Sequence, residues 1–157
     1  MEKGLKQVRA RKENMRGAKK IILDWKGSFR LEARNEKGVS VSFDALKEYG
    51  GEETALSPME TLLASLAACS SFDVLTILKK KRQKVTGYSV EATAERREDS
   101  YPKVFTKIHL KYIVKGESVA REAVERAIEL SEEKYCSVGA MLKNSVPITS
   151  SFEILSA

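Results

Sequence analysis

The sequence holds two cysteines, Cys69 and Cys136, and their side chains are the ones best suited to chemistry. A cysteine thiolate can attack a peroxide oxygen and become a sulfenic acid, which condenses with a second thiol to form a disulfide. This scheme requires the two Cα atoms to lie within about 7 Å of each other, a condition that a sequence cannot test. The alternative is that Cys69 is a small buried hydrophobic residue, as free cysteines often are.

The two cysteines differ in their predicted surroundings. Cys69 falls twelve residues into a predicted helix, beyond the first turn where the helix dipole acts, so a lower pKa would need a cation from another segment. Asp73, one turn later, works against a thiolate unless it is paired. Cys136 directly precedes a short helix predicted to begin near Ser137, whose free N–H groups favour an anion, and Lys134 is two residues away. The sequence therefore predicts the better setting for a thiolate at Cys136.

Other kinds of site have little support in the sequence. His109 is the only histidine, and it alternates with Lys107 and Lys111 on a strand face that we expect to be exposed to solvent. There is no Cys/His cluster for a metal ion, no glycine-rich phosphate loop after a strand, and no Ser/His/Asp order. We therefore expect no bound metal and no bound cofactor.

A long helix must position Cys69. Ser57–Glu60 has the pattern of a helix start, with a serine cap, a proline at the first helical position and a glutamate at the third. The helix is expected to run to about Arg82, and Glu60 and Asp73 are its only charged residues before Leu78. A helix that is apolar nearly all round is buried. Since a domain of this size normally leaves one side of each helix wet, we expect a second copy of the chain to cover it.

The remaining elements predict a mixed α+β fold. Residue patterns indicate two further helices, one opening at Ser118 and ending near residues 133–135, the other spanning about 137–144. Strands are predicted at residues 21–25, 29–34, 39–43, 88–95, 104–114 and 148–155.

The net charge of +6 is confined to one end of the chain. Residues 1–20 contain eight basic and two acidic residues, which account for all of it. We expect residues 1–19 to form a basic arm, flexible or loosely helical, and residues 20–157 to form a single domain. An arm that binds nucleic acid is an alternative, but no aromatic residues interleave with the charges, so we do not expect a nucleic-acid partner.

The composition is ordinary for a globular protein, with 42% hydrophobic and 32% charged residues. No apolar run approaches the ~20 residues of a membrane span, and the charged N-terminus is not a secretory signal, so we expect a cytoplasmic protein with no membrane partner. In that reducing compartment a pair of thiols is more often catalytic than structural.

Three segments together resemble the OsmC/Ohr family, and the match is closest to its YhfA-like branch. They are Ser57–Cys69, Asp73–Leu78 and Glu133–Val138, and the resemblance extends from about residue 20 to the end. It implies an intertwined α+β homodimer in which antiparallel sheets pack around two long buried central helices, with active sites at the interface. It also implies reduction of organic hydroperoxides in the oxidative stress response. By position, Cys69 is then the peroxidatic cysteine, Cys136 the resolving cysteine, and an external dithiol the reductant.

The chain departs from the family pattern in its basic residues. Family members place an arginine in the N-terminal strands or in the loop before the helix, whereas this chain has none in residues 35–81. Lys26 and Lys47 occupy the comparable segments. Candidates without motif support are Arg30, Arg34, Arg96 and Arg97.

Glu60 is a supporting candidate with an alternative role. It lies nine residues before Cys69, whereas the peroxidase members have a glutamate at ten. A nine-residue separation puts Glu60 on the opposite face of a continuous helix. Its alternative role is that of the capping-box glutamate.

Two functions follow from the sequence. The leading hypothesis is a thiol-dependent hydroperoxide reductase that uses the Cys69/Cys136 pair. The alternative is a non-enzymatic OsmC-like dimer that binds a small apolar or electrophilic ligand in the interface pocket.

Overall fold

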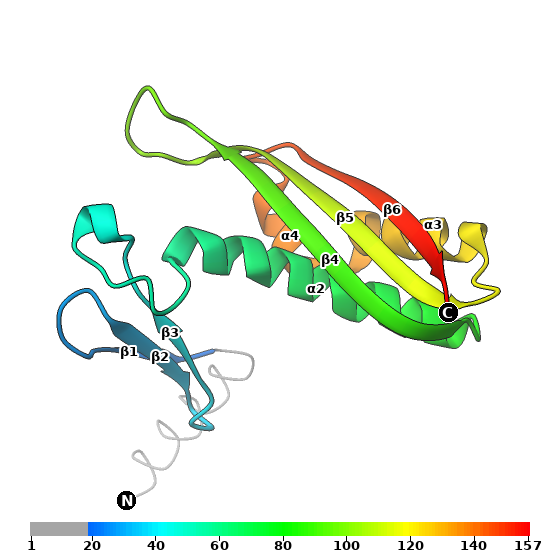
Figure 1. Cartoon of the computed structure of the whole chain (residues 1–157), viewed down its shortest axis with the longest axis horizontal. Coiled ribbons are helices and arrows are strands. Elements are labelled where there is room, and N and C mark those ends of the chain that lie inside the picture. Colours follow the sequence, from blue (N-terminus) through cyan, green and yellow to red (C-terminus); the bar gives the residue numbers. More distant parts are fainter. Residues whose placement is uncertain (1–18) are drawn as a thin grey trace, which may run out of the picture. The chain divides into compact units, whose positions relative to one another are not determined.

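The computed structural model describes residues 19–157, which form two compact units. The first unit ends at Pro58 and the second comprises Met59–Ala157 (Figure 1). The predicted basic arm, residues 1–19, lies outside the described residues except for Lys19. The expectation of a single domain over residues 20–157 stays a prediction.

The first unit is built on an antiparallel sheet with strand order β1-β2-β3. Its elements are β1 (Ile21–Trp25), β2 (Leu31–Asn35), β3 (Ser40–Phe43) and the 3-10 helix η1 (Lys47–Tyr49). The predicted hairpin turn forms because Asn35 Oδ1 accepts hydrogen bonds from the backbone N–H groups of Lys37 and Val39, at 2.9 and 3.1 Å. Gly38 has a φ of 79° in this turn, a conformation that glycine adopts without strain.

Asp44 organises the loop that follows β3. The residue is 3% exposed, and its carboxylate accepts hydrogen bonds from the backbone N–H groups of Glu52 and Thr54 and from the Thr54 hydroxyl, at 2.9 to 3.2 Å. These donors, led by the Thr54 backbone, hold the pKa of the Asp44 carboxyl below its ordinary value. The loop therefore closes around an ionised side chain.

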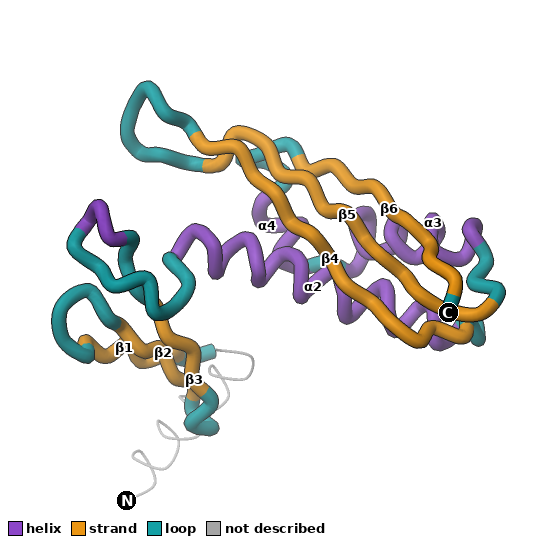
Figure 2. Tube along the Cα trace, viewed as in Figure 1, coloured by secondary structure: helices purple, strands orange, loops and turns teal. Residues whose placement is uncertain are grey.

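The second unit combines a three-stranded mixed sheet with helices, which confirms the predicted α+β class. Strand β4 pairs antiparallel with β5, as the predicted hairpin requires, whereas β6 pairs parallel to β5. A parallel pair needs a crossover connection, and α3, η2 and α4 provide it (Figure 2). The elements are α2 (Pro58–Lys80), β4 (Lys84–Arg96), β5 (Phe105–Glu117), α3 (Arg121–Leu130), the π-helical turn η2 (Ser131–Tyr135), α4 (Ser137–Leu142) and β6 (Ile148–Ser156).

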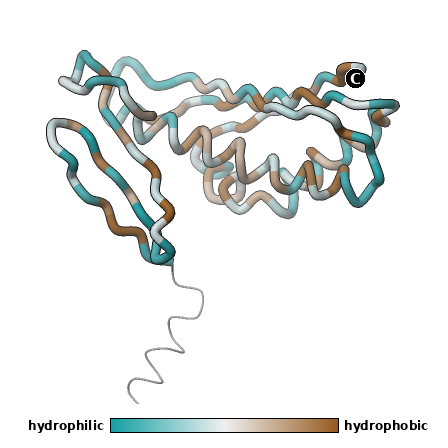
Figure 3. Tube along the Cα trace, turned by 60° about the horizontal axis from the view of Figure 1, so that its bottom comes forward, coloured by the Kyte–Doolittle hydropathy of each residue, from teal (hydrophilic) through white to brown (hydrophobic). Residues whose placement is uncertain are grey.

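The helices of the second unit all lie on one face of its sheet (Figures 1 and 3). The alternation predicted for residues 104–114 is confirmed from Ile108 to Val114, where every second side chain enters the core between sheet and helices, whereas Val104 and Thr106 are exposed. The outer face is polar, with ion pairs from Lys107 to Glu95 and from Lys111 to Glu153. The buried residues that α2 and β5 contribute to this core are Leu66, Val74, Leu78, Ile108, Leu110, Tyr112 and Val114.

Helix boundaries differ from the predicted ones for reasons of backbone geometry. Helix α2 ends at Lys80 and not near Arg82, because Arg82 has a φ of 56° and left-handed backbone ends a helix. Helix α3 begins at Arg121 and not at Ser118, which has a φ of 51°. Helix α4 ends at Leu142, slightly before the predicted end.

Within its unit, α2 is buried on one face and exposed on the other. Residues at four-residue spacing, from Leu66 to Leu78, face the core, whereas Phe72 is 74% and Leu75 38% exposed. By length and composition α2 is apolar enough to cross a membrane, contrary to the sequence expectation. That expectation looked for an unbroken apolar run, and serine and threonine residues interrupt α2 without adding charge. Because one face packs on the sheet, α2 is a core helix of this unit.

Candidate functional site

Cys69 and Cys136 are brought together inside the second unit. Cys69 lies on α2 and is half-buried, whereas Cys136 directly precedes α4 and is buried. Both thiols are free, and Cys69 lies near enough to Cys136 to raise the pKa of its thiol. The tertiary structure therefore brings together two thiols that are 67 residues apart in the sequence.

The π-helical turn η2 places Cys136. Helix α3 widens into η2 after Leu130, and the Cys136 N–H donates to the Ser131 carbonyl at 2.8 Å. Extended backbone at Cys136 then makes it the N-cap of α4, where its Sγ accepts a hydrogen bond from the Gly139 N–H at 3.3 Å. The sulfur thus occupies the position that a serine or aspartate oxygen usually takes at a helix start.

The thiol of Cys136 is harder to ionise than the sequence suggested. Burial raises the pKa of the Cys136 thiol to about 11, the Gly139 N–H lowers it by a lesser amount, and Cys69 and Asp73 add smaller increases. The prediction of a thiolate-favouring setting at Cys136 is therefore wrong. The predicted N–H donor is there, but the residue is 5% exposed and desolvation is the larger effect.

A chain of hydrogen bonds runs through the core beside the cysteines. Ser131 donates its hydroxyl proton to Asp73 Oδ2 at 3.1 Å, so it accepts from the Ser70 hydroxyl at 3.0 Å. Ser70 in turn accepts from the Tyr112 hydroxyl at 2.5 Å. Burial raises the pKa of Tyr112, so this phenol keeps its proton. The chain satisfies three buried hydroxyl groups and ties α2 to β5 and to the start of η2.

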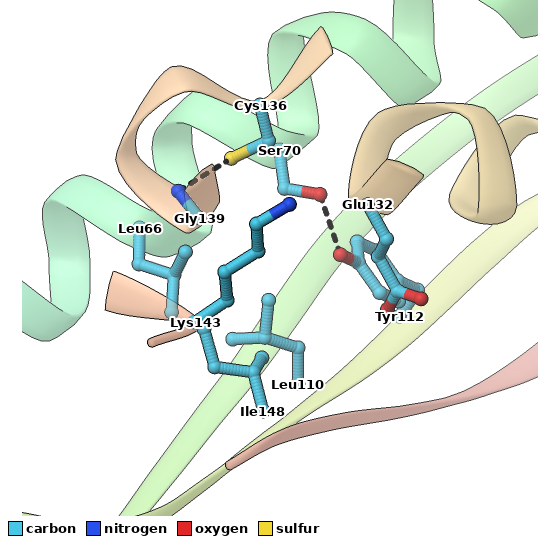
Figure 4. Close-up of a pocket in the computed structure, with 9 residues that line it drawn as sticks. All are labelled: Leu66, Ser70, Leu110, Tyr112, Glu132, Cys136, Gly139, Lys143 and Ile148. Atoms are coloured by element: carbon cyan, nitrogen blue, oxygen red, sulfur yellow. Dashed lines mark hydrogen bonds between the residues drawn. The ribbon is translucent and has the colours of Figure 1, made fainter. Parts of the chain in front are cut away.

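A pocket of about 110 Å³ lies between α2, α4 and the sheet, and we call it the α4 pocket (Figure 4). Cys136 and the Tyr112 end of the hydrogen-bond chain line it, and the Lys143 side chain extends across it. Among the described residues that line the pocket, Cys136 is present and Cys69 is not. The full lining is Leu66, Ser70, Leu110, Tyr112, Glu132, Cys136, Gly139, Lys143 and Ile148.

Three of the basic candidates, Lys26, Lys47 and Arg96, each have an acceptor within their own unit. In the first unit Lys26 pairs with Glu32 at 3.5 Å and Lys47 pairs with Glu53 at 3.7 Å. In the second unit Arg96 donates through Nε and Nη2 to the carbonyl of residue 103, which closes the β4–β5 hairpin.

The other predicted residues also have defined places. Glu60 lies in the first turn of α2, as predicted. The Lys134 ammonium lies 5.4 Å from the centre of the Tyr135 ring. His109 on β5 is hydrogen-bonded through its two ring nitrogens to Thr149 and Ser151 of β6. Within residues 19–157 no group of His, Cys, Asp or Glu side chains is arranged to hold a metal ion.

Sequence reasoning missed the residues that surround Cys136. A hydroxyl group at position 70, in the middle of an apolar helix, must find a hydrogen-bond partner when buried, and that rule could have singled out Ser70. Its partners Tyr112 and Ser131 are 42 and 61 residues away, so their identity depends on the fold. Lys143 carries no distinguishing pattern in the sequence.

The fold and this site define an α+β protein with a neighbouring pair of free thiols in its core. The family model for OsmC-like protein matches residues 50–151, and the chain therefore belongs to the OsmC-like family, as its sequence resemblance implied. Protein YhfA of Escherichia coli K12 is 48% identical over 105 residues, which cover 67% of this chain and 78% of YhfA.

Solved structures agree with this assignment. A hypothetical protein of Aquifex aeolicus VF5 superposes with a TM-score of 0.77 at 35% identity, over 89% of this chain and 98% of that one. An organic hydroperoxide resistance protein OsmC of Legionella pneumophila has a TM-score of 0.62 at 15% identity, over 85% and 96% of the two chains. The second likeness concerns the fold.

Proposed function

We propose that this protein reduces organic hydroperoxides with Cys69 as the peroxidatic and Cys136 as the resolving cysteine, in a reducing cytoplasmic compartment. The observation that carries the proposal is that two free thiols on different elements lie near enough for Cys69 to shift the pKa of Cys136. A structural cysteine needs no such partner, whereas a two-cysteine peroxidase needs a second thiol close to the first.

The chemistry proceeds in three steps. The Cys69 thiolate attacks the terminal oxygen of the hydroperoxide, the O–O bond breaks, and the alcohol leaves as Cys69 becomes a sulfenic acid. The Cys136 sulfur then attacks the Cys69 sulfur, water leaves, and a disulfide forms. An external dithiol reduces the disulfide and is itself oxidised.

The first step needs a cation near Cys69, and we propose Lys26, Lys47 or Arg96 for this role. Each of them has an acceptor in the structure, so the role requires an exchange of partner. Replacing each in turn by methionine tests the assignment. The variant that lacks the activating cation should alkylate at Cys69 more slowly near neutral pH, because less thiolate is present.

We further propose that the protein acts as a homodimer in which a second copy covers the exposed face of α2. Phe72 and Leu75 lie on this face, and small residues beside them would allow a partner helix to approach closely. Scattering or sedimentation should give about twice the 17.5 kDa of one chain at micromolar concentration. A stable folded monomer would contradict the dimer. The small exposed residues are Ala64, Ser65 and Ala68.

The enzymatic proposal is tested by adding one equivalent of an organic hydroperoxide to the reduced protein. Both thiols should be consumed, and peptide mapping should find one Cys69–Cys136 disulfide per chain. The variant Cys69→Ser should leave the hydroperoxide unreacted, whereas Cys136→Ser should retain a sulfenic acid on Cys69. Consumption no faster than by free cysteine, with Cys69 alkylating like an ordinary thiol, would refute the peroxidase.

The second candidate is a non-enzymatic dimer that binds a small apolar or electrophilic molecule. The α4 pocket favours it, since Leu66, Leu110 and Ile148 give the pocket an apolar wall beside a thiol. In that case an apolar electrophile should modify the protein with saturation kinetics while hydroperoxides react no faster than with free cysteine.

A further inference from the structure

We propose that the α4 pocket is the entry site for a small thiol that reduces the oxidised cysteine pair, and that this thiol attacks Cys136. The inference rests on the proposed function, because it concerns the step that returns the Cys69–Cys136 disulfide to two thiols. The residues that line the α4 pocket all belong to one chain, so this step needs no residue from a second copy.

The geometry of the pocket selects the sulfur that is attacked. Cys136 lines the pocket and Cys69 does not, so a thiol bound there meets the Cys136 sulfur first, whereas a thiol that arrives outside the pocket meets the more exposed Cys69. Cys69 approaches Cys136 from α2, outside the pocket lining. Thiol–disulfide exchange depends on which sulfur is accessible to the attacking thiolate. Entry through the α4 pocket therefore leads to Cys136 with Cys69 as the leaving group.

Burial of Cys136 also favours attack on the Cys136 sulfur, with Cys69 as the leaving group. A thiol with a raised pKa is a slow leaving group in disulfide exchange. Burial raises the pKa of the Cys136 thiol to about 11, so an attack that expels Cys136 is disfavoured. Attack on Cys136 itself removes that penalty from the first exchange and moves it to the later step that releases Cys136 from the mixed disulfide.

The lining of the pocket indicates the kind of thiol that fits. Leu66, Leu110 and Ile148 offer contacts to a short aliphatic chain, and the Lys143 ammonium extends across the pocket, where it attracts a thiolate (Figure 4). A cavity of roughly 150 Å³ holds a benzene molecule. The 110 Å³ of this pocket therefore suits a compact thiol of a few heavy atoms better than a bulky one.

Reduction of the disulfide takes two thiol–disulfide exchange steps. The incoming thiolate bonds to the Cys136 sulfur, the S–S bond to Cys69 breaks, and Cys69 leaves as a thiolate. A second thiol, from the same dithiol or from another molecule, attacks the mixed disulfide on its outer sulfur. Cys136 returns to the thiol form with one proton, and the external thiols are oxidised to their disulfide.

The test starts from the oxidised chain, with the disulfide formed by diamide so that no hydroperoxide is needed. The oxidised protein is mixed with 2-mercaptoethanol, quenched early with acid, and digested to locate the mixed disulfide. The adduct should lie on Cys136. An adduct on Cys69 would overturn the inference while leaving the peroxidase proposal intact. Failure to form the Cys69–Cys136 disulfide with either diamide or hydroperoxide would overturn the proposed function itself.

Two substitutions in the pocket test its role in the reductive step. Lys143→Met should slow reduction by 2-mercaptoethanol about threefold to fivefold relative to oxidation of the same variant, the range expected when one exposed charge is lost. Lys79→Met is the matched control, because Lys79 is exposed at the end of α2, and it should leave reduction unchanged. Equal effects of the two substitutions would contradict the pocket assignment.

Gly139→Ala narrows the pocket beside the sulfur. A Cβ at Gly139 would lie 3.2 Å from Cys136 Sγ and 3.7 Å from a Leu66 methyl group. Reduction by 2-mercaptoethanol should slow in this variant relative to Gly87→Ala, which crowds the Lys115 side chain of the sheet by a similar amount.

The size of the reductant gives a further test with the wild-type protein. The rate of each thiol is first normalised to its rate with a small reference disulfide. Glutathione should then reduce the protein more slowly than 2-mercaptoethanol does. Equal normalised rates would show that reduction bypasses the pocket.

Discussion

The resolving step should depend on pH in a way set by the burial of Cys136. In that step the Cys136 thiolate attacks the sulfenic acid on Cys69, so the rate follows the thiolate fraction of Cys136. Burial raises the pKa of this thiol to about 11, and a raised pKa keeps the thiol protonated until higher pH. The rate constant should therefore keep rising with pH well above the range in which an ordinary thiol is fully ionised.

The size of the pH effect distinguishes a Cys136 thiol with a raised pKa from an ordinary thiol. For a pKa of about 11, the thiolate fraction grows about ninefold between pH 9 and pH 10, whereas for an ordinary thiol with a pKa of about 8.5 it grows only about 1.3-fold. At pH 7 roughly one Cys136 in ten thousand is ionised, so the sulfenic acid should persist long enough to be trapped.

Rapid mixing with one equivalent of hydroperoxide, followed by acid quench and intact-mass analysis, measures this step directly. Loss of sulfenic acid into disulfide is a first-order phase, independent of hydroperoxide concentration, and Cys136→Ser should lack it. A rate constant that stays level between pH 9 and pH 10 would refute the reasoning. It would mean that a neighbouring base takes the proton from Cys136 during the attack.

Three further predictions concern the fold. Leu66→Asp should prevent folding, because an unpaired carboxylate replaces a side chain that is 2% exposed, while Leu66→Ala should fold with a loss of about 2–5 kcal/mol in urea titrations. Tyr112→Phe should lose about 1–3 kcal/mol, because the Ser70 hydroxyl oxygen then lacks its donor; an unchanged free energy of unfolding would argue against the hydrogen-bond chain. Burial raises the pKa of Tyr88 to about 12, so this residue contributes stability that is complete below pH 10 and lost as the pH rises to 12; Tyr88→Phe should remove that part of the alkaline transition.

Much of the fold follows from local patterns in the sequence. Period-two alternation placed β5 with its apolar side chains inward, and the start signal at Ser57–Glu60 located the beginning of α2. Such patterns are local because a strand or helix face is defined within a few residues. The family could be recognised for the same reason, since its three segments are contiguous stretches of sequence. Where the boundaries differ, at Ser118 and Arg82, the cause is a left-handed backbone that these residue types do not announce.

The site was only partly predictable. The sequence by itself singled out Cys69 and Cys136, because a thiol is chemically distinctive wherever it lies. The tertiary structure decided that the two residues meet and that burial makes the Cys136 thiol hard to ionise. The local N–H donor at Gly139 was foreseeable, whereas desolvation sums over every neighbour that the fold brings near, and the charge of Asp73 on α2 adds to its effect. A pKa in a protein core is therefore a property of the packed structure, and a sequence specifies only the group that titrates.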